Sequence, residues 1–376
     1  MANLSDSLQI TSEDWERTPI SVKVLIEDME LRTNSPIPHE LSRKESGKQH
    51  LVIVIPVFDD WEALSQLLLL IDQIRLPQTI DLSVVVVDDY SINLVPPDLE
   101  QQTYRQIQEV NVLRLRRNLG HQRAIAVGLS YVYHHLTCDL VVVMDGDGED
   151  SPFAIEHLLS VSEQVGHTKA IFAKRIKRSE GRTFQFFYFI YKRIFRLLIG
   201  KEISVGNFSL LPATLLKNIV VISEIWNHYS SGIYRSRIPY LEVGVPRARR
   251  LAGQPKMNLV SLVTHGLSSI AVYGDIVGTR ILLTIVILLA AFFPLLGVVV
   301  FVRLFTDWAI PGWATYVIGL LMIFLSQLIL IGVTFSMIIL SSRNQSNFIP
   351  ARDYRQFVDE FFQLTGSLSS KRVFEK

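Results

Sequence analysis

The sequence has one cysteine, Cys138, so no disulfide can form within the chain. No Gly-x-Gly-x-x-Gly segment follows the first apolar run, no Gly-Lys-Ser/Thr phosphate loop is present, and no paired His and Cys spacing of a zinc site occurs. These absences disfavour a dinucleotide-binding Rossmann domain, a P-loop protein and a zinc protein. The first residues also lack a basic segment followed by an apolar one, so we expect no cleaved signal peptide.

The chain also lacks an excess of charge of one sign. It has 37 Lys and Arg residues and 36 Asp and Glu residues, which give a formal net charge of +1. We expect no nucleic-acid partner. Hydrophobic residues make up 49% of the chain and the mean hydropathy is +0.28, which is high for a soluble protein. The apolar excess lies toward the C-terminal end.

Two long apolar runs, residues 281–302 and 313–340, contain no charged side chain. Each exceeds the roughly 20 apolar residues that cross a bilayer core of about 30 Å. The alternative is a pair of buried helices in a soluble core, although such helices rarely run so long without a charge. Residues 303–312 between the runs are too few for a domain, so the sequence predicts a two-helix transmembrane hairpin.

Basic residues flank both ends of this hairpin. They are Arg247, Arg249, Arg250, Lys256 and Arg280 before it, and Arg343, Arg352 and Arg355 after it. The positive-inside rule then predicts an integral membrane protein with both flanks, and hence both termini, in the cytoplasm. This corresponds to a bacterial inner membrane or its equivalent. Small hairpin anchors often associate with copies of themselves, so a homo-oligomer stays an open alternative.

Residues 1–48 are polar and form an N-terminal extension, after which the pattern changes. Short β-branched runs at 51–55, 82–87, 111–115, 140–144 and 170–173 alternate with helical patterns at 61–74, 122–133 and 153–165. Continuous apolar strands that alternate with helices predict a mostly parallel α/β sheet with both faces covered. Ligands bind such sheets beyond the carboxyl ends of the strands.

Acidic residues gather where these strands end. Asp145, Asp147 and Glu149 follow the run at 140–144 at alternate positions, so their side chains can share one face. Hard carboxylate oxygens suit Mg²⁺ or Mn²⁺, which commonly bridge protein to phosphate. An acidic, solvated turn is the alternative. Asp60 and Asp88 follow two other strands, and like charges held on one rim need a cation or hydrogen-bond donors.

Two further segments lie between the sheet and the hairpin. Residues 184–198 are dense in aromatic side chains with basic ones between them, which fits either a helix in the membrane interface or an aromatic core helix. Residues 251–280 form a juxtamembrane segment that leads into the first span, and residues 341–376 form a cytoplasmic tail.

Seven motifs, in this order and ahead of a two-span hairpin, resemble the family-2 inverting glycosyltransferases of the polyprenyl-phosphate sugar transferase type. That type includes dolichyl-phosphate mannose synthases and bacterial enzymes with two spans. The motifs are Val54-Ile-Pro-Val-Phe-Asp-Asp60, Val87-Asp-Asp-Tyr-Ser91, Arg117-Asn-Leu-Gly-His121, Asp145-Gly-Asp-Gly-Glu-Asp-Ser-Pro152, Ala173-Lys-Arg175, Gly206-Asn-Phe208 and Arg250-Leu-Ala-Gly-Gln-Pro-Lys256.

The resemblance implies that residues 49–250 form a Rossmann-like GT-A catalytic domain that binds a UDP- or GDP-linked sugar, with a polyprenyl phosphate as acceptor. Its implied residues fall into four groups. Pro56, Asp60 and Asp88 are expected to line the pocket for the base and ribose, and Asp145, Asp147 and Glu149 to bind Mg²⁺ or Mn²⁺. Arg175, Arg250 and Lys256 are expected to bind the diphosphate, with Asp145 also near the donor. The implied catalytic residues are Asp147, Arg175 and Asn207.

Several positions depart from the family pattern: Asp59-Asp60 replaces the usual Asn-Glu pair, Tyr90 replaces a common glycine, and two further departures bear on the acceptor. Asn207 stands where many relatives carry an aspartate, and Ser209 where they carry an arginine. A phosphate acceptor is already anionic and needs no strong base, whereas a hydroxyl acceptor needs one, for which His228 is a candidate. The open alternatives are a glycosyltransferase acting on another lipid or glycan, and a non-catalytic nucleotide-sugar-binding scaffold in the membrane.

Overall fold

The computed structural model describes residues 47–175, 193, 196–200, 205–253, 259–306, 308, 310, 312–344 and 348–365. The chain divides into two compact units, residues 1–47 and 48–376, and every element below belongs to the second. Lys256 and most of the aromatic segment 184–198 lie outside the described residues, so the predictions made for them stay untested.

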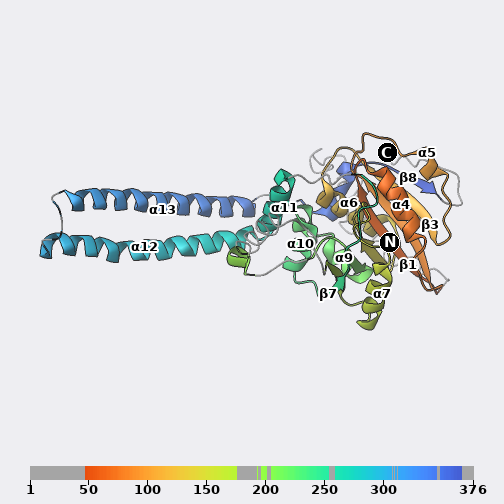
Figure 1. Cartoon of the computed structure of the whole chain (residues 1–376), viewed down its shortest axis with the longest axis horizontal. Coiled ribbons are helices and arrows are strands. Elements are labelled where there is room, and N and C mark those ends of the chain that lie inside the picture. The colour runs from red at the N-terminus through yellow and green to blue at the C-terminus, as the bar shows by residue number, and fades with distance from the viewer. Residues whose placement is uncertain are drawn as a thin grey trace, which may run out of the picture. The chain divides into compact units, whose positions relative to one another are not determined.

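One eight-stranded sheet forms the centre of this unit, with the strand order β7-β5-β6-β4-β1-β2-β3-β8 (Figure 1). The bounds are β1 (Gln49–Val57), β2 (Ile80–Asp88), β3 (Ile107–Leu115), β4 (Leu140–Val143), β5 (Ala170–Arg175), β6 (Ser209–Pro212), β7 (Tyr240–Val245) and β8 (Val358–Thr365). β1 pairs in parallel with both β2 and β4, and β2 with β3. The predicted mostly parallel sheet is confirmed; β6 and β8 are its antiparallel members.

Helices cover both faces of the sheet, because successive side chains of a strand point to opposite sides. Leu51, Ile53 and Ile55 of β1 pack with α4 (Trp61–Ile71) and α7 (Ala154–Gln164). Val52 and Val54 pack on the other face with α6 (His121–His135). Short helices between the strands are α5 (Pro97–Glu100), α9 (Ala213–Ile219), η2 (Ser223–Trp226) and α10 (Tyr229–Arg235).

α6 lies unusually close to the sheet at Gly128. A Cβ atom at this position would lie 2.6 Å from Cγ2 of Val87 and 2.8 Å from Cγ1 of Val54, so only glycine fits. α6 begins at His121, about two turns before this contact.

The end of the chain completes the sheet. After α13, the elements α14 (Pro350–Asp353) and η3 (Tyr354–Phe357) lead into β8, which pairs antiparallel with β3. Tyr354 is 1% exposed and its hydroxyl lies 2.8 Å from Nε2 of His135 on α6. The sequence predicts a cytoplasmic tail over residues 341–376, whereas residues 358–365 form an edge strand of the sheet.

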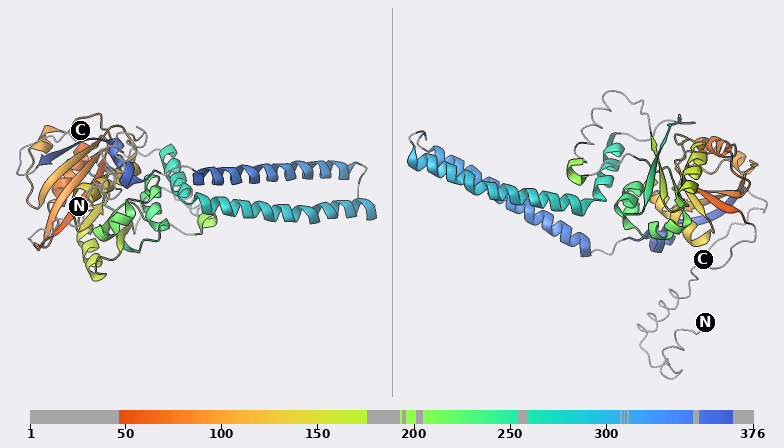
Figure 2. Two further views of the ribbon diagram at one scale, coloured as in Figure 1. Left: turned by 180° about the vertical axis from the view of Figure 1, so that it is seen from behind. Right: turned by 90° about the horizontal axis from the view of Figure 1, so that it is seen from below.

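The hairpin consists of α12 (Gly274–Phe305) and α13 (Trp313–Asn344), preceded by α11 (Leu259–Ala271) (Figures 1 and 2). Both are long and apolar enough to cross a membrane. In the most apolar 18-residue stretch of each helix, only 17% of α12 and 6% of α13 is buried within the chain. That exposure does not fit two core helices of a soluble protein. The buried residues of α12 recur at every seventh position (Gly278, Ile285, Phe292 and Val299), which is the spacing of a helix packed along one partner.

Candidate active site

The site lies at the carboxyl ends of β1, β2 and β4. In the parallel register Val54 of β1 is level with Val143 of β4, and Val57 is level with Asp88 of β2. The segment that follows β4 therefore begins beside Pro56, and the acids that follow the three strands share one rim. The structure thus brings the predicted rim residues of β1, β2 and β4 together.

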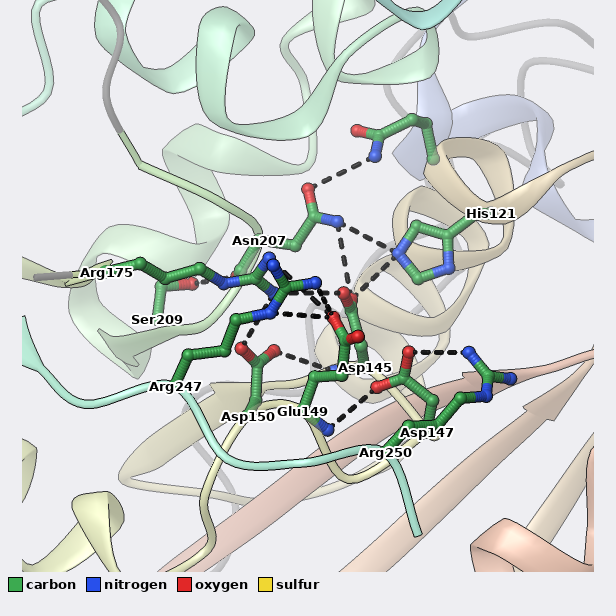
Figure 3. Close-up of polar contacts among 11 residues, drawn as sticks. His121, Asp145, Asp147, Glu149, Asp150, Arg175, Asn207, Ser209, Arg247 and Arg250 are labelled. Carbon is green, nitrogen blue, oxygen red and sulfur yellow. Dashed lines mark hydrogen bonds and ion pairs between the residues drawn. The ribbon is translucent and has the colours of Figure 1, made fainter. Parts of the chain in front are cut away.

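Asp145 is held by groups from three other segments (Figure 3). Its Oδ1 atom lies 3.0 Å from Nε2 of His121 and accepts a hydrogen bond of 3.4 Å from Nδ2 of Asn207. Its Oδ2 atom lies 3.9 Å from Nη2 of Arg175. Burial opposes ionisation of this carboxyl, but His121, Arg175 and the amide of Asn207 outweigh it and lower the pKa of Asp145 to about 2. Asp145 is therefore an anion in the folded chain.

Asp147 faces the segment that follows β7. Its Oδ2 atom lies 3.0 Å from Nη1 of Arg250, and the other guanidinium nitrogen of Arg250 pairs with Asp60 at the end of β1. The backbone N–H of Leu251 donates to the carbonyl of Asp147 at 3.0 Å. Burial and the nearby carboxylates of Asp145 and Glu149 raise the pKa of Asp147. Arg250 thus joins the segments that follow β1 and β4.

Glu149 and Asp150 form the third part of the site. Nε of Arg247 lies 3.1 Å from Oε2 of Glu149, and a second nitrogen of Arg247 is closer still. Arg175 lies 3.2 Å from Oδ1 of Asp150 and 3.9 Å from Oε2 of Glu149. Asp150 is buried, and burial with the neighbouring Asp145 raises its pKa to about 7. Two guanidinium groups therefore converge on Glu149, as Figure 3 shows.

The charges of this cluster fit a divalent cation. Its carboxylates are Asp60, Asp145, Asp147, Glu149 and Asp150, and its guanidinium groups are Arg175, Arg247 and Arg250. The five carboxyl groups outnumber the three guanidinium groups, and carboxylate oxygen is the donor that Mg²⁺ and Mn²⁺ accept. In the described part of the chain no three His, Cys, Asp or Glu side chains form a ready-made ligand group, since arginines hold Asp147 and Glu149.

Asp88 and Asp89 shape the rim next to β1. Asp88 is buried; its Oδ1 accepts from the N–H of Ser91 at 2.8 Å, and Nε of Arg114 lies 3.6 Å from its Oδ2. Asp89 accepts from the N–H groups of Leu119 at 2.6 Å and Gly120 at 2.8 Å, just before α6. Burial raises the pKa of Asp89 to about 6 against the lowering effect of these two bonds. In this structure Asp88 thus has partners within the protein, and its expected contact with a ribose or base stays a prediction.

Asn207, Ser209 and His228 have distinct surroundings. Asn207 lies in the cluster, where its Oδ1 atom accepts from Nε2 of Gln122 at 3.1 Å. Ser209 is buried in β6, and its hydroxyl lies 2.7 Å from that of Tyr229. His228 precedes α10, where its Nδ1 accepts from the N–H of Ser231 at 3.4 Å and lies 3.1 Å from its hydroxyl. These contacts give the candidate base His228 a helix-capping role.

Three residues of the cluster were not assigned a role from the sequence: His121, Asp150 and Arg247. His121 closes the motif Arg117-Asn-Leu-Gly-His121, and Asp150 lies within the acidic motif, so both were visible as parts of a pattern. Arg247 was counted only among the basic residues before the hairpin. No pattern in the sequence indicates that it pairs with Glu149.

Comparison with known proteins agrees with this architecture. Residues 52–220 match the family Glycosyl transferase family 2. The chain is 26% identical over 231 residues to the uncharacterized glycosyltransferase YkcC of Bacillus subtilis, covering 60% of this chain and 68% of that protein. It is 27% identical over 120 residues to an undecaprenyl-phosphate 4-deoxy-4-formamido-L-arabinose transferase of Erwinia tasmaniensis, covering 32% of this chain and 36% of that one.

One similar solved structure is that of glucosyl-3-phosphoglycerate synthase of Mycobacterium tuberculosis in complex with Mn²⁺, UDP-glucose and phosphoglyceric acid. The two sequences are 15% identical, and the TM-score is 0.44. The match covers 61% of this chain and 80% of that one. The family match, residues 52–220, runs from β1 to the end of α9 and includes Asp60, Asp145, Asp147 and Arg175. The protein is therefore a transferase that carries a glycosyltransferase family 2 domain with a GT-A fold.

Proposed function

We propose that this protein is a membrane-anchored inverting glycosyltransferase that moves a sugar from a nucleoside-diphosphate sugar to a polyprenyl phosphate. The observation that carries the proposal is the cluster in which Arg250 pairs with both Asp147 and Asp60 while Arg175 lies against Asp145 and Asp150. Arginines and carboxylates, the groups that pair with phosphates and with divalent metals, thus share one rim of a chain that also holds two apolar helices, which supports the proposal.

The donor diphosphate is the group that this cluster suits. Guanidinium forks pair with phosphate oxygens in a bidentate manner, and Arg175 and Arg250 can exchange a carboxylate partner for a phosphate. Lys256, six residues after Arg250, is expected to add a third cation. Asp145, Asp147 and Glu149 are the expected holders of Mg²⁺ or Mn²⁺, which supplies Lewis-acid stabilisation of the leaving diphosphate when bound.

A phosphate acceptor suits the residue at position 207. The amide of Asn207 cannot take a proton as a carboxylate can, and in the structure it donates toward Asp145. A polyprenyl phosphate needs no base, because its oxygen is already anionic when it attacks the anomeric carbon in line and displaces the nucleoside diphosphate. The name of the relative from Erwinia tasmaniensis, undecaprenyl-phosphate 4-deoxy-4-formamido-L-arabinose transferase, supports this acceptor class.

The connectivity supports two membrane crossings. β7 precedes α12 and β8 follows α13, yet both strands belong to one sheet. A chain that leaves the sheet and rejoins it must cross a bilayer an even number of times. With basic residues on both flanks, we place this sheet and both ends of the hairpin on the cytoplasmic side. The anchor brings the lipid head group to the rim, and such positioning supplies much of the rate.

The experiment is the transfer of radiolabelled sugar from a panel of UDP- and GDP-sugars into a lipid extract by the purified full chain. A labelled lipid whose sugar is released by mild acid is the expected product of a phosphodiester linkage. An acid-resistant labelled lipid would indicate a glycolipid acceptor instead. Nucleotide binding without transfer across the whole panel would favour the non-catalytic scaffold and overturn the proposal.

A further inference from the structure

His121 was given no role by the sequence, yet its ring lies at one side of the cluster, beside Asp145 and Asn207 (Figure 3). It is the first residue of α6, and its side chain is 41% exposed, so a ligand can reach the ring. Nε2 of His121 lies 3.0 Å from Oδ1 of Asp145 and 2.9 Å from Nδ2 of Asn207.

A chain of amide groups determines which atoms face this nitrogen. The N–H of Tyr229 donates to Oε1 of Gln122 at 2.6 Å, so the amide of Gln122 must present its NH₂ group to Asn207. That NH₂ donates to Oδ1 of Asn207 at 3.1 Å, so Asn207 must present its own NH₂ to His121 and Asp145. The orientation of Asn207 thus follows from a backbone group that cannot be reversed.

This orientation leaves His121 and Asp145 with a conflict. If Nε2 carries a proton, that proton satisfies Asp145 but meets the NH₂ group of Asn207 at a nitrogen–nitrogen distance of 2.9 Å. If Nε2 is bare, it accepts from Asn207, but its lone pair and a carboxylate oxygen face each other at 3.0 Å. A metal cation bound to both acceptor atoms removes the repulsion between them, because each then donates its lone pair to the cation, and the NH₂ group of Asn207 donates to Asp145.

The spacing agrees with that solution. Ligand atoms on neighbouring corners of an octahedron with bonds of about 2.1 Å lie about 3.0 Å apart. Nε2 of His121 and Oδ1 of Asp145 have this separation. Glu149, the third ligand expected from the sequence, is instead held by Arg247 and faces Arg175.

Resting on the proposed function, we propose that His121 is a ligand of the catalytic metal through Nε2, beside Asp145, and that the site therefore favours Mn²⁺ over Mg²⁺. Imidazole nitrogen suits transition metals, whereas Mg²⁺ takes oxygen ligands almost exclusively. Asp147 joins them once the donor diphosphate draws Arg250 away from it. This accounts for the lack of a complete three-ligand group among the described residues.

The test uses the purified full chain with Mn²⁺ as the probe, alone and then with UDP or GDP. Electron spin-echo spectroscopy detects a ¹⁴N nucleus bound directly to Mn²⁺, and growth on ¹⁵N-histidine must change that signal in the wild-type chain. His121→Ala is expected to remove the nitrogen signal and weaken Mn²⁺ binding at least about 10-fold, while Mg²⁺ binding, measured by competition, changes less than about 3-fold. His157→Ala, which changes an exposed histidine of α7, is the matched control and should leave both metals unaffected.

The outcomes separate this inference from the proposed function. Bound Mn²⁺ without nitrogen coupling in the wild-type chain, or coupling that survives His121→Ala, would overturn the role of His121 and leave sugar transfer intact. A wild-type chain that binds no Mn²⁺, with or without UDP or GDP, would overturn both this inference and the metal in the proposed reaction. The ¹⁵N-histidine comparison needs no variant, so it decides the question even if His121→Ala does not fold.

Discussion

The buried ring of Tyr354 offers a direct test of how the end of the chain contributes to the catalytic domain. A buried tyrosine removes about 150–250 Å² from water, which corresponds to about 4–6 kcal/mol as an upper value. Measured truncations of large buried aromatic residues cost about 3–5 kcal/mol. We therefore expect Tyr354→Ala to lower the free energy of unfolding by about 4 kcal/mol, and Tm by about 10 °C.

The matched variant Tyr354→Phe keeps the ring and removes only the hydroxyl that lies 2.8 Å from Nε2 of His135. Its expected cost is about 1 kcal/mol, the usual net value of one hydrogen bond. Both values follow from thermal unfolding of the detergent-solubilised full chain, monitored by the near-UV circular dichroism of the catalytic domain. If Tyr354→Ala unfolds at the wild-type temperature, then residues 348–365 are not part of the domain core, and the pairing of β8 with β3 is refuted.

Three other perturbations test the rim and its support. Arg250→Lys keeps a positive charge but loses the fork that spans Asp60 and Asp147, so sugar transfer should fall about 100-fold in initial-rate assays, and a wild-type rate would exclude Arg250 from phosphate binding. The pKa of Asp89 is raised to about 6, so its contribution to stability is complete below its ordinary pKa near 3.8 and is lost as pH rises through 6. The Tm of the wild type minus the Tm of Asp89→Asn should therefore fall from pH 4 to pH 7. A value of this difference that does not change with pH would contradict the raised pKa. Gly128→Ala should cost about 1–3 kcal/mol in thermal unfolding because its methyl group overlaps the sheet, and an unchanged Tm would show that α6 can move away.

The central strands could be predicted because each is a continuous β-branched run buried on both faces. The buried stretches of β1, β2 and β4 consist mainly of Val, Ile and Leu, the pattern typical of a parallel sheet covered on both faces. β8 could not be predicted in the same way, because Val358–Thr365 contains Asp, Glu and Gln and is only half-buried at the edge of the sheet. Its partner β3 lies more than 240 residues earlier, on the far side of the hairpin, and no local pattern records such a pairing.

The residues of the site, like the strands, could be predicted only in part. Residues that follow strands were foreseeable, and the structure places Asp145, Asp147 and Glu149 on one rim with Arg175 and Arg250; their chemical roles stay predictions. Contacts between distant segments were not foreseeable. The meeting of His121 with Asp145 depends on the close approach of α6 to the sheet at Gly128, and the pairing of Arg247 with Glu149 depends on the path of the chain after β7.

The most direct test of the central claim is the metal-dependent transfer of labelled sugar to polyprenyl phosphate by the wild-type chain and by Asp147→Ala. We predict an acid-labile labelled lipid from the wild-type chain, lost on chelation of divalent cations and restored by Mn²⁺. Asp147→Ala should insert into membranes and fold, yet form no such lipid. Wild-type turnover by Asp147→Ala, or transfer unaffected by chelation, would contradict a reaction carried by acids and a metal at the rim of the sheet.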